Sequence, residues 1–229
     1  MLLTSFSNLF ENDVMATLLV KNSAVLVTMD AHRREIEGGG IFVRDGIVEA
    51  VGSEVDLPGE ADEVVNTSDC VVLPGLINTH HHFYQNLTRT VPAAQNATLF
   101  QWLKTLYPIW ARMGPEEIQC ATQLALSEMA LAGTTCASDH LYLFPNGARL
   151  DDEIEAAEEI GLRLHATRGA MSIGESNGGL PPDQLVESES HILDDSLRLI
   201  QAYHDPRPGA MIRIGIAPCS PFSVSRELM

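Results

Sequence analysis

The sequence of 229 residues is long enough for one large domain or two smaller ones, and 45% hydrophobic residues suffice for a core. The formal net charge of -17 disfavours binding to nucleic acid or to an anionic membrane, because their phosphates would repel the chain. No apolar run approaches the roughly 20 residues of a membrane-spanning helix, and no signal-peptide pattern opens the chain. We therefore expect a cytoplasmic protein with a small-molecule partner.

The four cysteines are widely scattered and form no C-x-x-C pair. This spacing argues against a disulfide scaffold or a cysteine zinc site, so they are interpreted as reduced thiols.

The N-terminal part predicts short strands. Residues 1–15 show little periodicity, and we expect them to be disordered. Within residues 16–70, apolar segments predict a small antiparallel β unit with strands at 17–21, 24–29, 40–44 and 47–51 and a tight hairpin turn at Asp45-Gly46. A further segment, 63–66, follows a polar link. Such a unit is too small to bury a core by itself.

The apolar run from Val71 ends in three consecutive histidines, His80 to His82. The run predicts a buried strand, along which His80 and His82 point to one face and His81 to the other. Two neighbouring imidazoles can hold a zinc ion, and a catalytic zinc site leaves one position open for water. The alternative is a solvated histidine loop.

A long segment, residues 83–113, follows the histidines and has the length of a lid or binding loop. Its aromatic residues, among them Trp102, fit either a packed amphipathic helix or a pocket wall for a planar ring. Gln85 offers a neutral donor and acceptor for a base edge or lactam, with a structural amide as the alternative.

Helices and strands then alternate. Helices are predicted near 114–133, 151–160 and 182–203, and strands at 134–138, 162–168 and 211–217. This order predicts a parallel sheet, in a barrel or an open sheet. No G-x-G-x-x-G motif follows a strand, which disfavours a dinucleotide-binding open sheet. We favour the barrel, because polar residues gather at the carboxyl ends of its strands: His80, His82, His140, Arg168 and Cys219.

Longer motifs carry a resemblance. The run Asn78-Thr79-His80-His81-His82-Phe83-Tyr84-Gln85 up to Arg89, with residues 133–145, 167–172 and 218–221, resembles the amidohydrolase superfamily. Within it, the chain is similar to the ATZ/TRZ-type branch of 8-oxoguanine deaminases and hydroxydechloroatrazine ethylaminohydrolases. The resemblance implies an α/β fold: the N-terminal half of a (β/α)8 TIM barrel over residues 71–229, preceded by part of a β-sandwich domain over 16–70.

The resemblance also implies a reaction. A metal-bound hydroxide would attack a ring amidine carbon of a purine-like heterocycle, 8-oxoguanine before others, and release ammonia. The alternatives are an s-triazine amino- or chlorohydrolase and, in another class, an inactive fragment. The metal would be Zn²⁺, with Fe²⁺ as a second candidate. Two-metal members of the superfamily bridge their ions with a lysine at the end of the fourth barrel strand. The corresponding strand here, 211–217, has no lysine, so one ion per chain is expected. The further His, His, Asp and catalytic Glu are expected beyond residue 229, and the oligomeric state stays open.

Several polar residues are candidates for substrate contact, each against a structural alternative. Arg168 could bind a ring carbonyl or form an ion pair, and His140 could contact the leaving group or face solvent. Where nucleoside deaminases of the branch place Glu before Trp-Leu, this chain has Gln101, which favours a free base. The candidate substrate-binding residues are Gln85, Trp102, His140, Tyr142, Arg168 and Cys219.

Overall fold

The computed structural model describes residues 16–229 and divides the chain into two compact units. The first extends to Pro74 and the second covers Gly75–Met229. The disorder expected for residues 1–15 lies outside the described residues.

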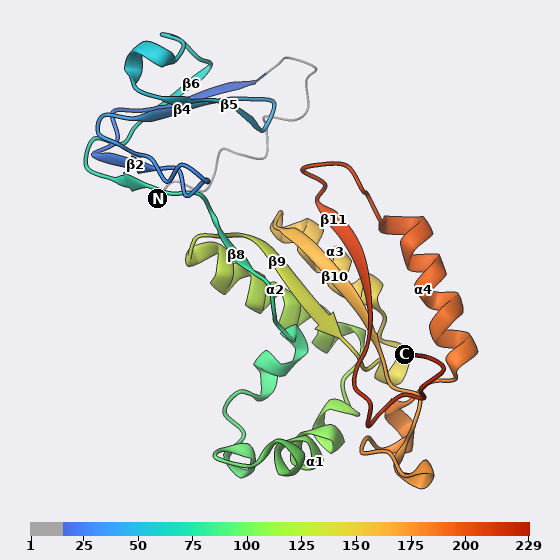
Figure 1. Ribbon diagram of the computed structural model, residues 1–229. Coiled ribbons are helices and arrows are strands. Elements are labelled where there is room, and N and C mark those ends of the chain that lie inside the picture. The colour runs from blue at the N-terminus through green and yellow to red at the C-terminus, as the bar shows by residue number, and fades with distance from the viewer. Residues whose placement is uncertain (1–15) are drawn as a thin grey trace. The chain divides into compact units, whose positions relative to one another are not determined.

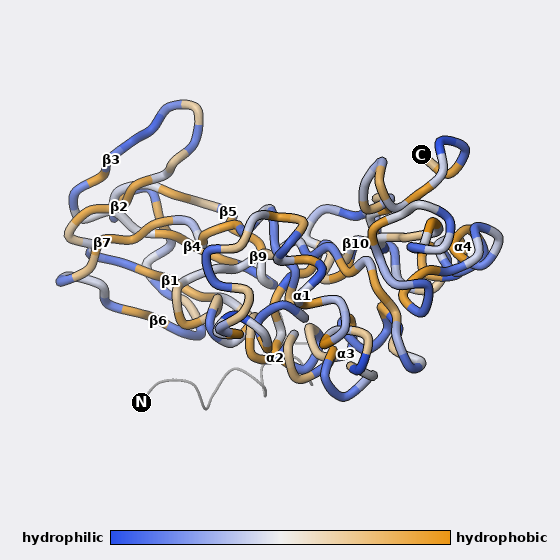
Figure 2. Tube along the Cα trace, turned by 90° about the horizontal axis from the view of Figure 1, so that it is seen from below, coloured by the Kyte–Doolittle hydropathy of each residue, from blue (hydrophilic) through white to orange (hydrophobic). Residues whose placement is uncertain are grey.

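Two small sheets form the first unit (Figure 1). One has the strand order β5-β4-β1-β6 and the other β3-β2-β7. Their strands carry hydrophobic residues, whereas the connection from β2 to β3 is hydrophilic (Figure 2). The bounds of the strands are β1 Thr17–Lys21, β2 Val25–Val27, β3 Glu35–Ile36, β4 Gly40–Arg44, β5 Ile47–Gly52, β6 Glu63–Asn66 and β7 Val71–Val72.

The expected antiparallel pairing is confirmed for β1 with β4 and for β4 with β5. The β4–β5 hairpin turns at Asp45-Gly46 as predicted, and both residues have positive φ angles. However, β6 pairs with β1 and β7 pairs with β2 in parallel. Sequence periodicity gives the position of a strand but not its partner, so these non-local parallel pairs could not be foreseen.

The apolar run before the histidines forms two strands instead of one. Val71–Val72 belongs to the first unit, and β8, Leu76–Asn78, opens the sheet of the second unit. Pro74 separates them, because proline has no backbone N–H to give to a sheet.

The second unit has a four-stranded sheet of order β8-β9-β10-β11, and every pairing in it is parallel. Helices α2, α3 and α4 pack along β9, β10 and β11 (Figure 1). The predicted alternation of helices and strands is confirmed. The bounds are α1 Leu99–Trp110, α2 Pro115–Leu131, β9 Thr134–Leu141, α3 Leu150–Ile160, β10 Arg163–Ala170, α4 Glu189–Tyr203 and β11 Ile212–Pro218. Short 3₁₀ helices span Glu54–Asp56, Phe83–Thr88, Pro92–Ala94, Pro145–Gly147, Glu175–Asn177 and Asp183–Leu185.

The strands place alternate residues on opposite faces. On β10, Leu164, Ala166 and Arg168 are buried, whereas Arg163 and His165 are exposed. The buried side chains face the layer of helices, since period-two alternation puts every second residue on one face. The polar ends of β8 and β9 therefore have two distinct faces, and this division organises the site.

Candidate metal centre

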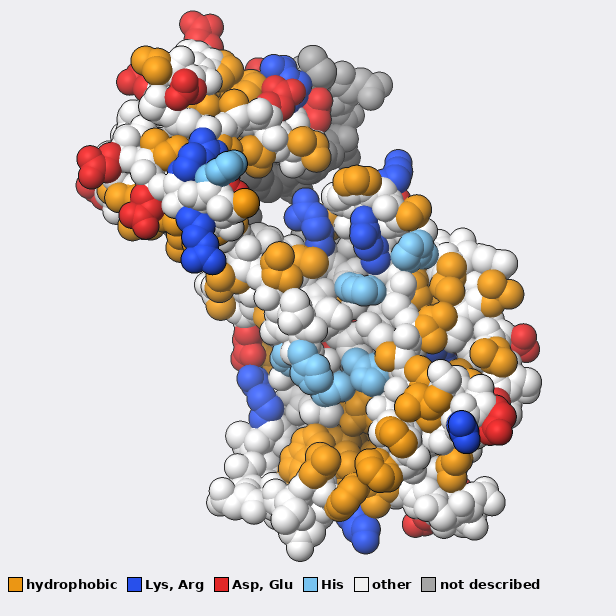
Figure 3. All heavy atoms as spheres, viewed as in Figure 1, with side chains coloured by type: hydrophobic (Ala, Val, Ile, Leu, Met, Phe, Trp, Pro, Cys, Tyr) orange, Lys and Arg blue, Asp and Glu red, His pale blue; other side chains and the backbone are white. Residues whose placement is uncertain are grey.

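The three histidines follow β8 after Thr79, just past the end of the strand. The ring centroids of His80 and His82 are 5.1 Å apart and their planes are nearly perpendicular, at 86°. The ring of His81 lies instead beside Phe83, at 5.1 Å. Figure 3 shows histidine side chains gathered beside a group of hydrophobic ones. The geometry agrees with the alternation argued from the sequence.

The ring of His82 is held in one orientation. Its Nδ1 lies 2.8 Å from the carbonyl oxygen of His140 and donates a hydrogen bond to it. The other nitrogen, Nε2, then carries the lone pair, which is the arrangement that metal-binding histidines adopt when a carbonyl holds their second nitrogen. Burial lowers the pKa of His82, so the ring is neutral at physiological pH. The donor set therefore fits a zinc ion.

The pair is not accompanied by further ligands in the part of the chain that the structure describes. Among residues 16–229, no three His, Cys, Asp or Glu side chains lie close enough together to hold a metal ion. These residues supply two candidate ligands, and a tetrahedral zinc site with three protein ligands needs one more.

His140 and Tyr142 extend the cluster from β9. The ring of His82 lies 5.5 Å from that of His140 and 5.3 Å from that of Tyr142. His140 Nε2 donates across β10 to the carbonyl oxygen of Ala217 on β11, over 2.9 Å. It can reach that far because the residue between them is Gly169, where a Cβ would lie 2.6 Å from His140 Nε2. Burial lowers the pKa of His140, which leaves its Nδ1 as a neutral acceptor.

Gln85 lies beside the same group. Its side-chain nitrogen donates to the hydroxyl of Tyr84 at 3.2 Å and to that of Tyr142 at 3.3 Å. These bonds orient the amide so that its oxygen remains the group that can accept a hydrogen bond. Cys219, at the end of β11, is half-buried against the same core, and burial raises its thiol pKa. The structure thus brings Gln85, His140 and Tyr142 together with His82.

The aromatic segment forms helix α1 and packs mainly on itself. Trp102 is half-buried, with its ring 5.2 Å from Trp110, which is fully buried and donates from Nε1 to the hydroxyl of Thr88. Gln101 accepts the backbone N–H of Thr98 at the start of the helix. The packed helix, one of the two alternatives left by the sequence, accounts for Trp110, and Gln101 acts as a capping residue.

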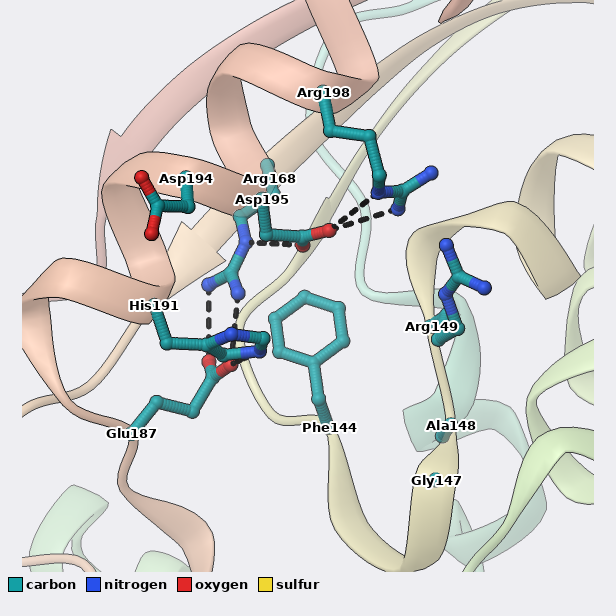
Figure 4. Close-up of a pocket in the computed structure, with 10 residues that line it drawn as sticks. All are labelled: Phe144, Gly147, Ala148, Arg149, Arg168, Glu187, His191, Asp194, Asp195 and Arg198. Carbon is teal, nitrogen blue, oxygen red and sulfur yellow. Dashed lines mark hydrogen bonds and ion pairs between the residues drawn. The ribbon is translucent and has the colours of Figure 1, made fainter.

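Arg168 is not brought together with the histidines. It is 1% exposed and lies on the helix side of β10, where it pairs with Glu187 through both terminal nitrogens and with Asp195 through Nε (Figure 4). Its guanidinium also donates to the carbonyl of Gly169 and lies 4.3 Å from the ring of Phe144. The structure thus shows the ion pair, one of the two alternatives left open by the sequence.

Sequence reasoning missed a buried carboxyl pair behind the histidines, Asp139 and Glu153, each 1% exposed. Asp139 Oδ1 accepts the backbone N–H of Phe83 at 2.6 Å. Burial raises the pKa of Asp139 to about 8, and that of Glu153 well above its usual value. The signal available in the sequence was an aspartate inside a strand, between Ala137 and Leu141, at positions that alternate onto the buried face.

A parallel α/β sheet with paired histidines after its first strand defines the class of this protein. The chain belongs to the amidohydrolase family, whose model matches residues 71–229. It is 51% identical over 194 residues to 8-oxoguanine deaminase of Pseudomonas aeruginosa, covering 83% of this chain and 43% of that protein. It is 36% identical over 222 residues to hydroxydechloroatrazine ethylaminohydrolase of Pseudomonas sp. strain ADP, covering 90% and 46%.

Among solved structures, the chain superposes on atrazine chlorohydrolase from Arthrobacter aurescens, crystallised with zinc, with a TM-score of 0.84 at 30% identity. The match covers 92% of this chain and 48% of that one. The chain thus spans less than half the length of the relatives it matches. Among the described residues, no helix is long and apolar enough to cross a membrane.

Proposed function

We propose that this chain carries part of the active site of a zinc-dependent hydrolytic deaminase that acts on a purine-like heterocycle, 8-oxoguanine before others. The observation that carries the proposal is the His80–His82 pair, with Nδ1 of His82 bonded to the His140 carbonyl and its Nε2 left to bind a metal. The four parallel strands correspond, in this proposal, to four of the eight βα units of a TIM barrel, whose chemistry lies at the carboxyl ends of the strands.

His80 and His82 would hold one zinc ion, with Fe²⁺ as the second candidate. Bound zinc would supply a water activated for attack at neutral pH. In the overall reaction, water adds to a ring amidine carbon, the bond from that carbon to nitrogen breaks, and ammonia leaves as the ring carbonyl forms.

The residues around His82 would bind and orient the ring. The amide oxygen of Gln85 would accept a ring N–H, because its nitrogen is already engaged by Tyr84 and Tyr142. Tyr142 would pack beside the ring, and the neutral His140 would accept a hydrogen bond at Nδ1. A lactam with a ring N–H matches this arrangement. Half-buried Cys219 and Trp102 remain candidates for the walls of the pocket.

An s-triazine is the second candidate substrate. The likeness to hydroxydechloroatrazine ethylaminohydrolase and to atrazine chlorohydrolase favours it, because both extend over at least 90% of this chain.

The test is ammonia release from parallel substrates by a protein with the complete barrel. We expect turnover of 8-oxoguanine to exceed that of guanosine and adenosine by orders of magnitude, and that of hydroxytriazines by less. Equal or faster turnover of a nucleoside would overturn the free-base proposal. Residues 1–229 assayed alone should release no ammonia, because residues 16–229 bring no third ligand to the histidine pair.

A further inference from the structure

The short segment that contains His82 is held by two consecutive residues of β9, Asp139 and His140. Three hydrogen bonds join the two elements. The N–H of His140 donates to the carbonyl of His81 at 3.0 Å, His82 Nδ1 donates to the carbonyl of His140, and the N–H of Phe83 donates to Asp139 Oδ1 at 2.6 Å. The bonds of the His81 carbonyl and of the Phe83 N–H lie on either side of the Cα of His82 along the chain.

Asp139 stands apart from the other polar residues of β9 because it faces the helices. Its carboxyl group is buried, whereas the neighbouring Ser138 and His140 are half-buried. Burying a polar group costs free energy unless it makes hydrogen bonds, so a carboxyl group here needs a counterpart. In the described part of the chain, Asp139 Oδ1 accepts the Phe83 N–H, whereas Asp139 Oδ2 and both carboxyl oxygens of Glu153 on α3 are buried without a hydrogen-bond partner.

Glu153 is the second buried carboxyl group behind the histidines. It is fully buried in helix α3, beside Asp139, and burial raises its pKa well above the usual range. Burial disfavours the charged form of both carboxyl groups, and Asp139 Oδ1 is engaged by the backbone N–H of Phe83. The ring of His81 also faces this pair, with Nδ1 3.9 Å from Asp139 Oδ1.

We propose that Asp139 is a positioning residue for the metal-binding pair: by fixing the backbone after His82 while the His140 carbonyl fixes the ring, it aims Nε2 of His82 at the zinc position. The proposal rests on the proposed function, because it assumes that His82 binds zinc. Asp139 does not touch the metal or the substrate, since it lies on the helix-facing side of β9.

Zinc affinity tests the proposal directly. The variants are Asp139→Ala, which removes the acceptor for Phe83 N–H, and Asp139→Asn, which keeps one. The matched control is Glu153→Gln, which alters the same buried pair without touching Phe83. Each is purified with the complete barrel, checked by circular dichroism, and titrated with zinc against a chromophoric chelator. Asp139→Val replaces Asp139→Ala if the alanine variant does not fold, because a β-branched residue suits a strand.

We expect Asp139→Ala to bind zinc about 10- to 100-fold more weakly, the usual range for residues that orient a metal ligand, and the other two variants to stay within about 3-fold of wild type. In the metal-free protein, nitrogen NMR of the His82 ring should show the Nδ1–H tautomer in wild type and Asp139→Asn, and lose it in Asp139→Ala. Unchanged affinity in folded Asp139→Ala, or an equal loss in Glu153→Gln, would refute the positioning role. A wild-type protein that binds no zinc through His82 would instead refute the proposed function.

Discussion

Two groups of ionisable side chains lie toward the carboxyl ends of the strands of the second unit, and they differ in how many of their hydrogen-bonding groups are already used. Around Arg168, every charged nitrogen has a partner: Glu187 and Asp195 bind the guanidinium, and Arg198 in turn binds Asp195 and Asp151. Around His82, the rings of His82 and His140 are each anchored through one nitrogen, and among the described residues the other nitrogen of each makes no hydrogen bond. Side chains with an unused nitrogen can bind a ligand, whereas side chains whose nitrogens all have partners stabilise the fold.

The cavity beside Arg168 shows why volume alone does not mark a site. It has about 440 Å³ and is lined by arginine, acidic and histidine side chains (Figure 4). Its ion pairs tie β10 to α4 and α4 to α3. We therefore assign it a structural role.

The largest expected effect is on stability, through the ion pairs of Arg168. Arg168→Met should lower the free energy of unfolding by about 3–5 kcal/mol, because it leaves Glu187 and Asp195 without a buried cation. Urea unfolding measures this loss, and zinc content of the folded fraction should stay at the wild-type value. A stable Arg168→Met protein with a raised KM for its substrate would show that Arg168 belongs to the site after all.

A smaller effect on stability is expected at Gly169, where the His140 side chain passes over β10 to reach Ala217. Gly169→Ala should cost about 1–3 kcal/mol, since its Cβ would meet both Tyr142 and His140 and the surroundings must shift. Thermal unfolding measures the cost, and a raised KM should accompany it as His140 leaves Ala217. Gly59→Ala is the control, because nothing lies within 4 Å of its added Cβ. Equal melting temperatures for the two variants would contradict the crowding at Gly169.

The smallest effect concerns pH. Burial raises the pKa of Asp139 to about 8 and that of Glu153 well above normal, so both bind protons more tightly in the folded state. Their contribution to stability is complete below the unfolded values near 4 and is lost as pH rises toward 8. Glu153→Gln should make this decline shallower, as measured by urea unfolding between pH 4 and 9. An unchanged slope would mean that the folded state does not raise the pKa of Glu153.

Much of the second unit was predictable from the sequence. The helix over Pro115–Leu131 has proline at its start and Gly133 just after its end, and the histidine alternation needs no tertiary information. The role of Arg168 was not predictable, because its partners Glu187 and Asp195 lie 19 and 27 residues away and meet it only once α4 packs on β10. The same holds for Asp139, whose neighbour Glu153 lies on another element.

Zinc content measured in protein with the complete barrel tests the central claim most directly. Elemental analysis of wild type, His81→Ala and His82→Ala compares adjacent histidines that differ in the face they present. The account predicts about one zinc per chain in wild type and in His81→Ala, and a loss of zinc in His82→Ala, since one strand face carries the ligands. Zinc lost from His81→Ala but retained in His82→Ala would contradict it.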